Sequence, residues 1–309
     1  MRRRQFGGEM KRSLFLLITI VVTVWLGCSS ELRFSYELNK MITIMRGREK
    51  AELTSEQFLK EVSNVDVIFV GEIHSDSATH IFEYELLQIL HTKHKKYAVA
   101  LEMFERDDQE ILNKYLAGRI TEKEFLKNVK FWSNYKSSYR LLVEFAKTHK
   151  LPVLAMNVPR SYANQVALGG EQVLYAIPDS EKVWMARELK CFDDAYKENF
   201  MEQMSEKNRP LPMLKFDMQN LYKAQCLKDD TMAETISDFL EKNPGCQVIA
   251  FQGVFHVANG LGLAQKLHLL KPEINQKIAV CIPVDNLSAL QYDTYQNKGD
   301  YLVFISDHK

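Results

Sequence analysis

The sequence predicts an α/β fold with a mainly parallel central sheet, flanking helices and a helical cap inserted between strands. Three observations lead to this prediction. Short apolar runs alternate with segments of helical periodicity, two of the runs end in the pattern Gly-x-x-His, and a long helical stretch over residues 160–243 separates two of the runs. Strand-helix-strand alternation is typical of parallel sheets with right-handed crossovers.

The predicted strands are apolar runs of the length and β-branched content expected for strands buried on both faces. They cover Val65–Val70, Tyr97–Met103, Leu151–Asn157, Cys246–Phe251, Lys277–Pro283 and Tyr301–Ile305. Between them, apolar residues at helical spacing predict helices over Ser77–His91, Asp107–Leu116, Glu122–Val129 and Tyr139–His149. Thr54 and Gln57 have the spacing of a capping box, which marks the start of the domain.

The helical cap spans about residues 160–243 and is longer than a simple crossover between parallel strands requires. Its predicted helices are Ser180–Leu189, Asp193–Ser205 and Met218–Glu241. We expect this cap to stand over the carboxyl edge of the sheet, where it would form a pocket or a dimer surface.

The N-terminus has the pattern of a lipoprotein signal peptide over residues 1–27. Basic residues precede the apolar run Leu14–Leu26, and Leu26-Gly27-Cys28 resembles the bacterial lipobox, which implies cleavage before Cys28 and lipidation of that residue. By the same resemblance, Ser29 favours the outer membrane. The sequence therefore predicts a lipid-anchored protein of the bacterial cell envelope, with a tether over residues 28–55 and one domain over residues 56–309.

Charge and cysteine content exclude several function classes. The 40 basic and 40 acidic residues balance, and because the signal peptide is basic the mature chain is mildly acidic, which argues against nucleic acid as a partner. No Cys-x-x-Cys spacing occurs, so zinc-ribbon and thioredoxin sites are excluded. A disulfide between Cys191 and Cys226 is one option in an oxidising compartment, and Cys246 and Cys281 are predicted to be buried thiols.

The repeated Gly-x-x-His ending is the strongest functional signal in the chain. Val67–Val70 leads into Gly71 and His74, and Val248–Phe251 leads into Gly253 and His256. Ligands of open α/β sheets bind beyond the carboxyl ends of the strands. We therefore expect both imidazoles to face one crevice.

The strand ends add further ionisable groups to this crevice, namely Glu72 beside His74, Glu102 at the second strand end and Arg160 after the third. Together with His74 and His256, the two carboxylates have the chemistry to bind Zn²⁺, Mn²⁺ or Co²⁺ with a water in the open position. In such a hydrolase Arg160 would stabilise an oxyanion, and Glu72 or Glu102 would act as general base. A structural alternative stays open, in which Glu72 and Arg160 form a buried ion pair and His74 caps the following helix.

Glu102 lies inside an otherwise apolar run, where an unpaired carboxylate costs several kcal/mol. It therefore requires a partner, and Arg160 or a histidine is the natural choice.

These motifs resemble those of the ChaN-like haem-binding uptake lipoproteins, in the Tiki, TraB and erythromycin-esterase superfamily. The resemblance rests on the endings VGEIH and FQGVFH, the segments ALEMF and NVPR, and AQCLKDDTMAE over residues 224–234. It covers about residues 56–285 and implies an α/β fold with a helical cap. It also implies a homodimer that encloses stacked haems, each with its iron held by a tyrosinate and with His and Lys of the other subunit near the propionates.

The resemblance implies two functions for the carried-over residues. In the first, the chain is a non-enzymatic envelope lipoprotein that binds haem non-covalently for iron uptake, in concert with an outer-membrane haem or iron receptor. Tyr162 is then the predicted iron ligand, with Tyr135, Tyr139 and Tyr196 as alternatives, and with His74 and His256 near the cofactor. In the second, His74, Glu72, Glu102, Arg160 and His256 form a metal-dependent hydrolase site. A third option is an anchored interaction protein in which these residues are structural.

Overall fold

The computed structural model describes residues 33–92, 96–205 and 217–306. The predicted signal peptide and Cys28 lie outside these residues, so the lipidation site stays a prediction. None of the helices in the described ranges combines the length and apolar content needed to cross a bilayer.

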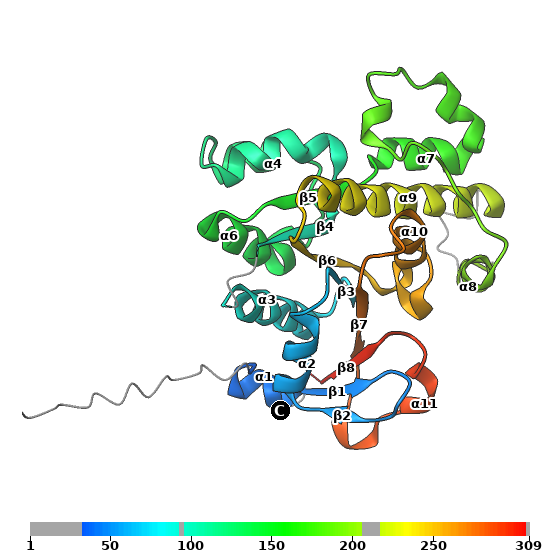
Figure 1. The fold of residues 1–309 in the computed structure, drawn as a ribbon. Coiled ribbons are helices and arrows are strands. Elements are labelled where there is room, and N and C mark those ends of the chain that lie inside the picture. The colour runs from blue at the N-terminus through cyan, green and yellow to red at the C-terminus, as the bar shows by residue number, and fades with distance from the viewer. Residues whose placement is uncertain (1–32, 93–95, 206–216, 307–309) are drawn as a thin grey trace, which may run out of the picture. The chain divides into compact units, whose positions relative to one another are not determined.

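An 8-stranded sheet in the order β2-β1-β8-β7-β3-β6-β4-β5 forms the centre of the described unit (Figure 1). The strands from β8 to β5 pair in parallel, whereas β1 pairs antiparallel with both β2 and β8. The mainly parallel sheet is therefore confirmed. The strands are β1 Ile42–Arg46, β2 Glu52–Leu53, β3 Val67–Glu72, β4 Tyr97–Glu105, β5 Val153–Asn157, β6 Gln247–Gly253, β7 Gln276–Pro283 and β8 Tyr301–Ile305.

Helices cover both faces of this sheet, as the continuous burial of β3, β4 and β6 requires. On one face, α2 (Ser55–Val62), α3 (Ser77–His91) and α6 (Arg140–His149) pack against alternate residues of the strands, and on the other face α9 (Met218–Lys242) and α10 (Leu263–Leu270) do so. Figure 1 shows α3 and α6 on the side opposite α9 and α10. The remaining helices are α1 Tyr36–Met41, α4 Gln109–Leu116, α5 Glu122–Asn128, α7 Arg160–Gly169, α8 Ala195–Gln203 and α11 Tyr292–Tyr295.

The segment predicted as a tether is folded where the structure describes it. Residues 36–53 form α1, β1 and β2, and Ile42 to Arg46 pair with Tyr301 to Ile305 of β8. The tether over residues 28–55 is therefore wrong for this part, because a partner strand from the other end of the chain supplies the backbone hydrogen bonds. The capping box of Thr54 and Gln57 is confirmed at the start of α2.

The cap lies between β5 and β6, as predicted, and consists of α7, α8, α9 and short 3₁₀ turns. It has its own apolar cluster, which includes Tyr162, Phe200 and Tyr222. The helix predicted over Ser180–Leu189 is wrong, since only a 3₁₀ turn at Lys182–Trp184 forms there. The chain after this turn runs extended, and backbone N–H groups of Ala186 and Arg187 donate to Thr231 and Glu234 of α9 instead of to their own helix.

Candidate functional site

The two strands that carry the Gly-x-x-His endings are neighbours in the sheet. Gly71 lies opposite Gln252, and Glu72 lies opposite Gly253. Strand β4, which carries Glu102, pairs with the other edge of β6. The three strand ends therefore meet at one edge, as we expected for a parallel sheet.

A cavity of about 600 Å³ lies at this edge. Its walls include His74, Glu102, His256 and Arg160, with Trp132 against the His74 ring at 4.6 Å between ring centroids. We call this cavity the strand-end pocket. The predicted crevice thus exists, and it brings both histidines to one place.

His256 is held between two carboxylates. Its Nδ1 atom donates to Asp229 at 2.5 Å, and its Nε2 atom faces Glu102 at 3.2 Å. Burial opposes the charge on this imidazole, but Glu102 and Asp229 outweigh it and raise the pKa of His256 to about 10. His256 is therefore an imidazolium at neutral pH, and a second proton on the ring is what both hydrogen bonds require.

Glu102 is the other half of this buried pair. Burial would raise the pKa of Glu102, but the charge and hydrogen bond of His256 and the backbone N–H of Gly253 lower it to about 2. The bond from Gly253 N to Glu102 Oε2 is 2.8 Å long. Of the two partners predicted for Glu102, histidine is confirmed and Arg160 is wrong.

His74 is oriented by a different carboxylate. Its Nδ1 atom donates to Glu72 Oε1 at 2.5 Å, and the hydroxyl of Tyr139 donates to the same oxygen at 2.6 Å. Burial lowers the pKa of His74, yet the bond to Glu72 and the charge of Glu102 raise it overall. The Nε2 atom is left to face the strand-end pocket, because the Nδ1 proton is committed to Glu72.

Gly253 allows this approach. A Cβ atom at this position would lie 2.9 Å from His74 Nε2 and 3.6 Å from Glu102 Oε2. The histidine of the first Gly-x-x-His pattern therefore accounts for the glycine of the second, whereas Gly71 of the first pattern packs against Val254 and Val257.

Arg160 does not bind either predicted carboxylate. Its Nε atom donates to Glu105 at 2.7 Å, at the rim of the strand-end pocket. The alternative of a buried Glu72–Arg160 pair is therefore wrong. So is the capping role of His74, since Asp76 caps α3 through Thr79 N at 2.8 Å.

No sequence pattern predicts the part that Asp229, Glu105 and Tyr139 play in this cluster. Tyr139 was considered only as an iron ligand, and Glu105 follows Glu102 by three positions at the end of β4. Asp229 lies in the acidic segment of α9, and its position in the sequence has no regular spacing from either Gly-x-x-His pattern. Only the packing of the cap on the strand ends reveals its contact with His256.

The predicted metal ligands do not converge on one point. In the described part of the chain, the group whose ligand atoms lie within 4.8 Å of one another is Glu72, His80 and Glu83. Both nitrogens of His256 and both oxygens of Glu102 already have partners. The arrangement of His74, His256, Glu72 and Glu102 therefore fits acid–base chemistry better than metal binding.

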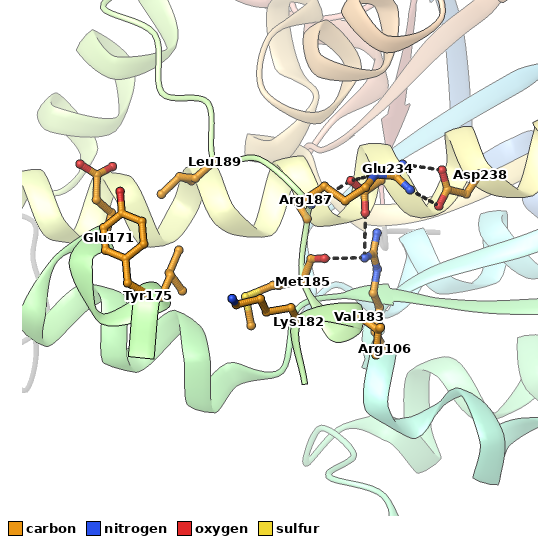
Figure 2. Close-up of a pocket in the computed structure, with 12 residues that line it drawn as sticks. Arg106, Glu171, Tyr175, Lys182, Val183, Met185, Arg187, Leu189, Glu234 and Asp238 are labelled. Atoms are coloured by element: carbon orange, nitrogen blue, oxygen red, sulfur yellow. Dashed lines mark hydrogen bonds and ion pairs between the residues drawn. The ribbon is translucent and has the colours of Figure 1, made fainter. Parts of the chain in front are cut away.

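A second cavity, of about 760 Å³, lies within the cap, between residues 171–189 and α9. Figure 2 shows Tyr175 and Glu171 on one side of it and an ion-paired cluster of Arg106, Arg187, Glu234 and Asp238 on the other. We call it the cap pocket.

The cap pocket has apolar walls and walls in which cations are paired with carboxylates. Tyr175 is 84% exposed and Val183 is 68% exposed, both unusual for large apolar side chains. Arg187 donates to Asp238 at 2.7 Å, and Arg106 donates to Glu234 at 3.1 Å and to Met185 O at 2.9 Å. An exposed phenol thus shares one pocket with apolar surface and, on the opposite side, with guanidinium groups that are paired with carboxylates.

The tyrosines named from the sequence are all buried. The hydroxyl of Tyr162 donates to Glu181 at 2.5 Å, and those of Tyr139 and Tyr196 donate to Glu72 and Asp229. Burial, helped by Glu181, raises the pKa of Tyr162 to about 12. This geometry disfavours Tyr162 as an iron ligand, because its oxygen is committed to a carboxylate.

The cysteines in the described ranges are free thiols. Cys246 and Cys281 are buried, as predicted. Burial, with a hydrogen bond to Cys191, raises the pKa of Cys226, so these two side chains are in direct contact although no disulfide joins them.

The fold and the strand-end cluster define an α/β protein with a helical cap and a polar centre where its parallel strands end. The chain belongs to the family described as haem-binding uptake, Tiki superfamily, ChaN, whose model matches residues 58–267. The predicted family is therefore confirmed. A comparison with curated proteins finds no significant match.

Solved structures with a similar fold include ChaN of Campylobacter jejuni, described with cofacial haem binding. It is 18% identical, with a TM-score of 0.63 over 86% of this chain and 98% of that chain. An erythromycin esterase, EreC, in its open conformation is 12% identical, with a TM-score of 0.46 over 78% of this chain and 77% of its own. A Bacillus cereus protein is 10% identical, with a TM-score of 0.45 over 87% and 96% of the two chains.

Proposed function

We propose that this chain binds haem non-covalently on its helical cap, as an envelope lipoprotein that takes part in haem or iron uptake. Family membership supports haem as the ligand. The single structural observation that carries the proposal is the exposed phenol of Tyr175 in the cap pocket.

Tyr175 has the chemistry of a haem ligand. Tyrosinate is a known axial ligand of ferric haem, as in catalase. Among the tyrosines in the described ranges, only Tyr175 and Tyr36 are strongly exposed, and Tyr36 lies on α1, where Lys40 covers its ring at 3.8 Å. Tyr175 is thus the phenol that a flat ligand reaches without opening the core.

The surroundings of Tyr175 fit the rest of a haem. Val183 and Leu174 offer apolar surface to the porphyrin. Lys182 and Arg187 are cations of the same pocket, and the propionates would compete for them with their present partners Asp179 and Asp238. Bound haem would supply the iron that the uptake function requires. Because Tyr175 is so exposed in a single copy, we propose that a second copy covers the bound haem, in a homodimer.

The test is a hemin titration of the purified chain, with the Soret band as the readout. We expect saturable binding that promotes dimerisation in sedimentation velocity. Tyr175→Phe should weaken binding at least tenfold, about 1.4 kcal/mol, whereas the control Tyr36→Phe should not. Binding that is absent in the native chain refutes haem binding, and binding unchanged in Tyr175→Phe refutes the site.

A second candidate function is hydrolysis at the strand-end pocket. The observation that favours it is His74, whose Nδ1 atom is fixed by Glu72 while Nε2 faces a cavity that also holds the charged His256. A histidine oriented by a carboxylate is the arrangement of a general base, and the positive charge of His256 lies at the same cavity.

This candidate is tested with chromogenic esters in the presence of chelator. Turnover that His74→Gln abolishes and that chelator leaves intact supports an acid–base hydrolase. Turnover that chelator removes supports the metal-dependent version with Zn²⁺, Mn²⁺ or Co²⁺, and no turnover in the native chain refutes both.

A further inference from the structure

A buried cluster next to His74 contains two residues, His80 and Glu83, that have no role in either proposed function. It consists of Glu72 at the end of β3 and of His80 and Glu83 in the first turns of α3. All three side chains are buried, and Glu83 is 0% exposed. His80 Nδ1 lies 2.9 Å from Glu83 Oε2 and 3.7 Å from Glu72 Oε2.

The hydrogen bonds around His80 fix which of its nitrogens carries the proton. Nε2 lies 3.2 Å from the backbone carbonyl of His74. A carbonyl oxygen only accepts, so Nε2 is the donor. In a neutral ring Nδ1 then presents its lone pair to two carboxylates. A histidine whose second nitrogen donates to a backbone carbonyl is the usual arrangement of a metal ligand.

Two carboxylate oxygens in this cluster, Glu72 Oε2 and Glu83 Oε1, accept no hydrogen bond from any other group in the described residues, and the two acids are close enough to share a proton. Buried oxygens without a hydrogen-bond donor are rare in native proteins, and a bound ion is one of the few explanations for them. In the described part of the chain, the ion pairs of Glu72 and Glu83 involve His74 and His80, and no Lys or Arg. Two acids buried without a strong cation are costly unless a metal ion or a shared proton joins them.

We propose that Glu72, His80 and Glu83 bind a divalent transition-metal ion such as Zn²⁺ or Mn²⁺. The three ligand atoms lie within 4.8 Å of one another. One imidazole nitrogen and carboxylate oxygens are ligands that both ions accept. This site is separate from the metal set predicted from the two Gly-x-x-His patterns, with which it shares only Glu72.

The shared residue gives the site a consequence for the pocket. Glu72 binds the ion through Oε2, while its Oε1 accepts from His74 and Tyr139. An ion at this position therefore fixes the carboxylate that orients His74, and so acts on the strand-end pocket without entering it.

The experiment measures bound metal in the full chain before any hemin is added. Elemental analysis of the native chain, and titration of the chelator-treated chain with Zn²⁺ and with Mn²⁺ alone, should give about one ion per chain. Glu83→Gln and His80→Gln should each weaken metal binding about 100-fold or more. A loss of this size exceeds what is usual when a residue that only supports a metal ligand is replaced. Glu85→Gln, on the same helix but bound to Ser35, is the matched control and should bind as the native chain does.

His256→Gln separates this site from a metal held at the strand ends. It should leave binding unchanged, and loss of the metal in this variant overturns the proposal. A native chain that binds neither ion also overturns the proposal, and a proton shared by the two acids then explains the cluster. A Glu83→Gln variant that keeps its metal overturns the proposal as well. Where the variants do not fold, anomalous diffraction from native crystals soaked in Zn²⁺ decides. A peak between the three side chains supports the proposal, and a peak elsewhere or none overturns it.

Discussion

Replacing Glu102 by Gln tests the buried charge pair that organises the strand-end pocket. Glu102 Oε1 faces His256 at 3.2 Å, and Oε2 accepts from Gly253 at 2.8 Å. A glutamine keeps one acceptor and turns the other into a donor, so it serves Gly253 or His256 but not both. The variant also leaves the His256 charge with Asp229 alone.

The expected cost follows from this geometry. Breaking a buried pair costs about 3–5 kcal/mol, and we expect the lower end, about 3 kcal/mol, because Asp229 still compensates His256. For a domain of this size that lowers Tm by about 6 °C. Urea unfolding at pH 7 measures the free-energy change. Glu110→Gln, at an exposed site, is the control and should stay within about 0.5 kcal/mol of the native chain. A Glu102→Gln variant as stable as this control contradicts the pairing.

Three further predictions follow from the same contacts. The pKa of His256 is raised from 6.5 to about 10, so this group contributes stability that is complete below pH 6.5 and is lost as the pH rises to 10. The pKa of Glu102 is lowered from 4.5 to about 2, so its contribution is lost as the pH falls through that range. Urea unfolding against pH should therefore show stability falling at both ends, and a native chain whose stability does not fall toward pH 10 refutes the charged His256. Gly253→Ala should displace His74 and cost about 1–3 kcal/mol, and an unchanged His74 resonance in NMR contradicts the close approach. Mild oxidation should join Cys191 to Cys226, which mass spectrometry detects as a linked peptide, and two thiols that stay reactive rule the contact out.

The fold was predictable wherever local periodicity and sheet burial agree. Helix α3 begins and ends at the predicted Ser77 and His91, because a capping residue and an apolar stripe both mark it. Where long-range contacts determine the secondary structure, local sequence patterns did not predict it. Strand β1 needs β8 from the far end of the chain, and the segment after Trp184 is extended because side chains of α9 bind its backbone N–H groups.

The site was predictable to the extent that parallel topology determines it. Adjacent strand ends brought His74, Glu102 and His256 together, as the paired patterns indicate. The partner of His256 was not predictable, since Asp229 lies on a cap helix whose docking no local pattern encodes. The exposure of individual tyrosine side chains was not predictable either, since no sequence pattern distinguishes the buried Tyr162 from the exposed Tyr175.

The central claim is that haem binds on the cap with its iron on Tyr175, and resonance Raman spectroscopy of the hemin-loaded chain tests it most directly. We predict an iron–phenolate vibration in the native chain and in Tyr36→Phe that is lost in Tyr175→Phe. A loaded native chain without that vibration, or a Tyr175→Phe variant that retains it, contradicts the claim.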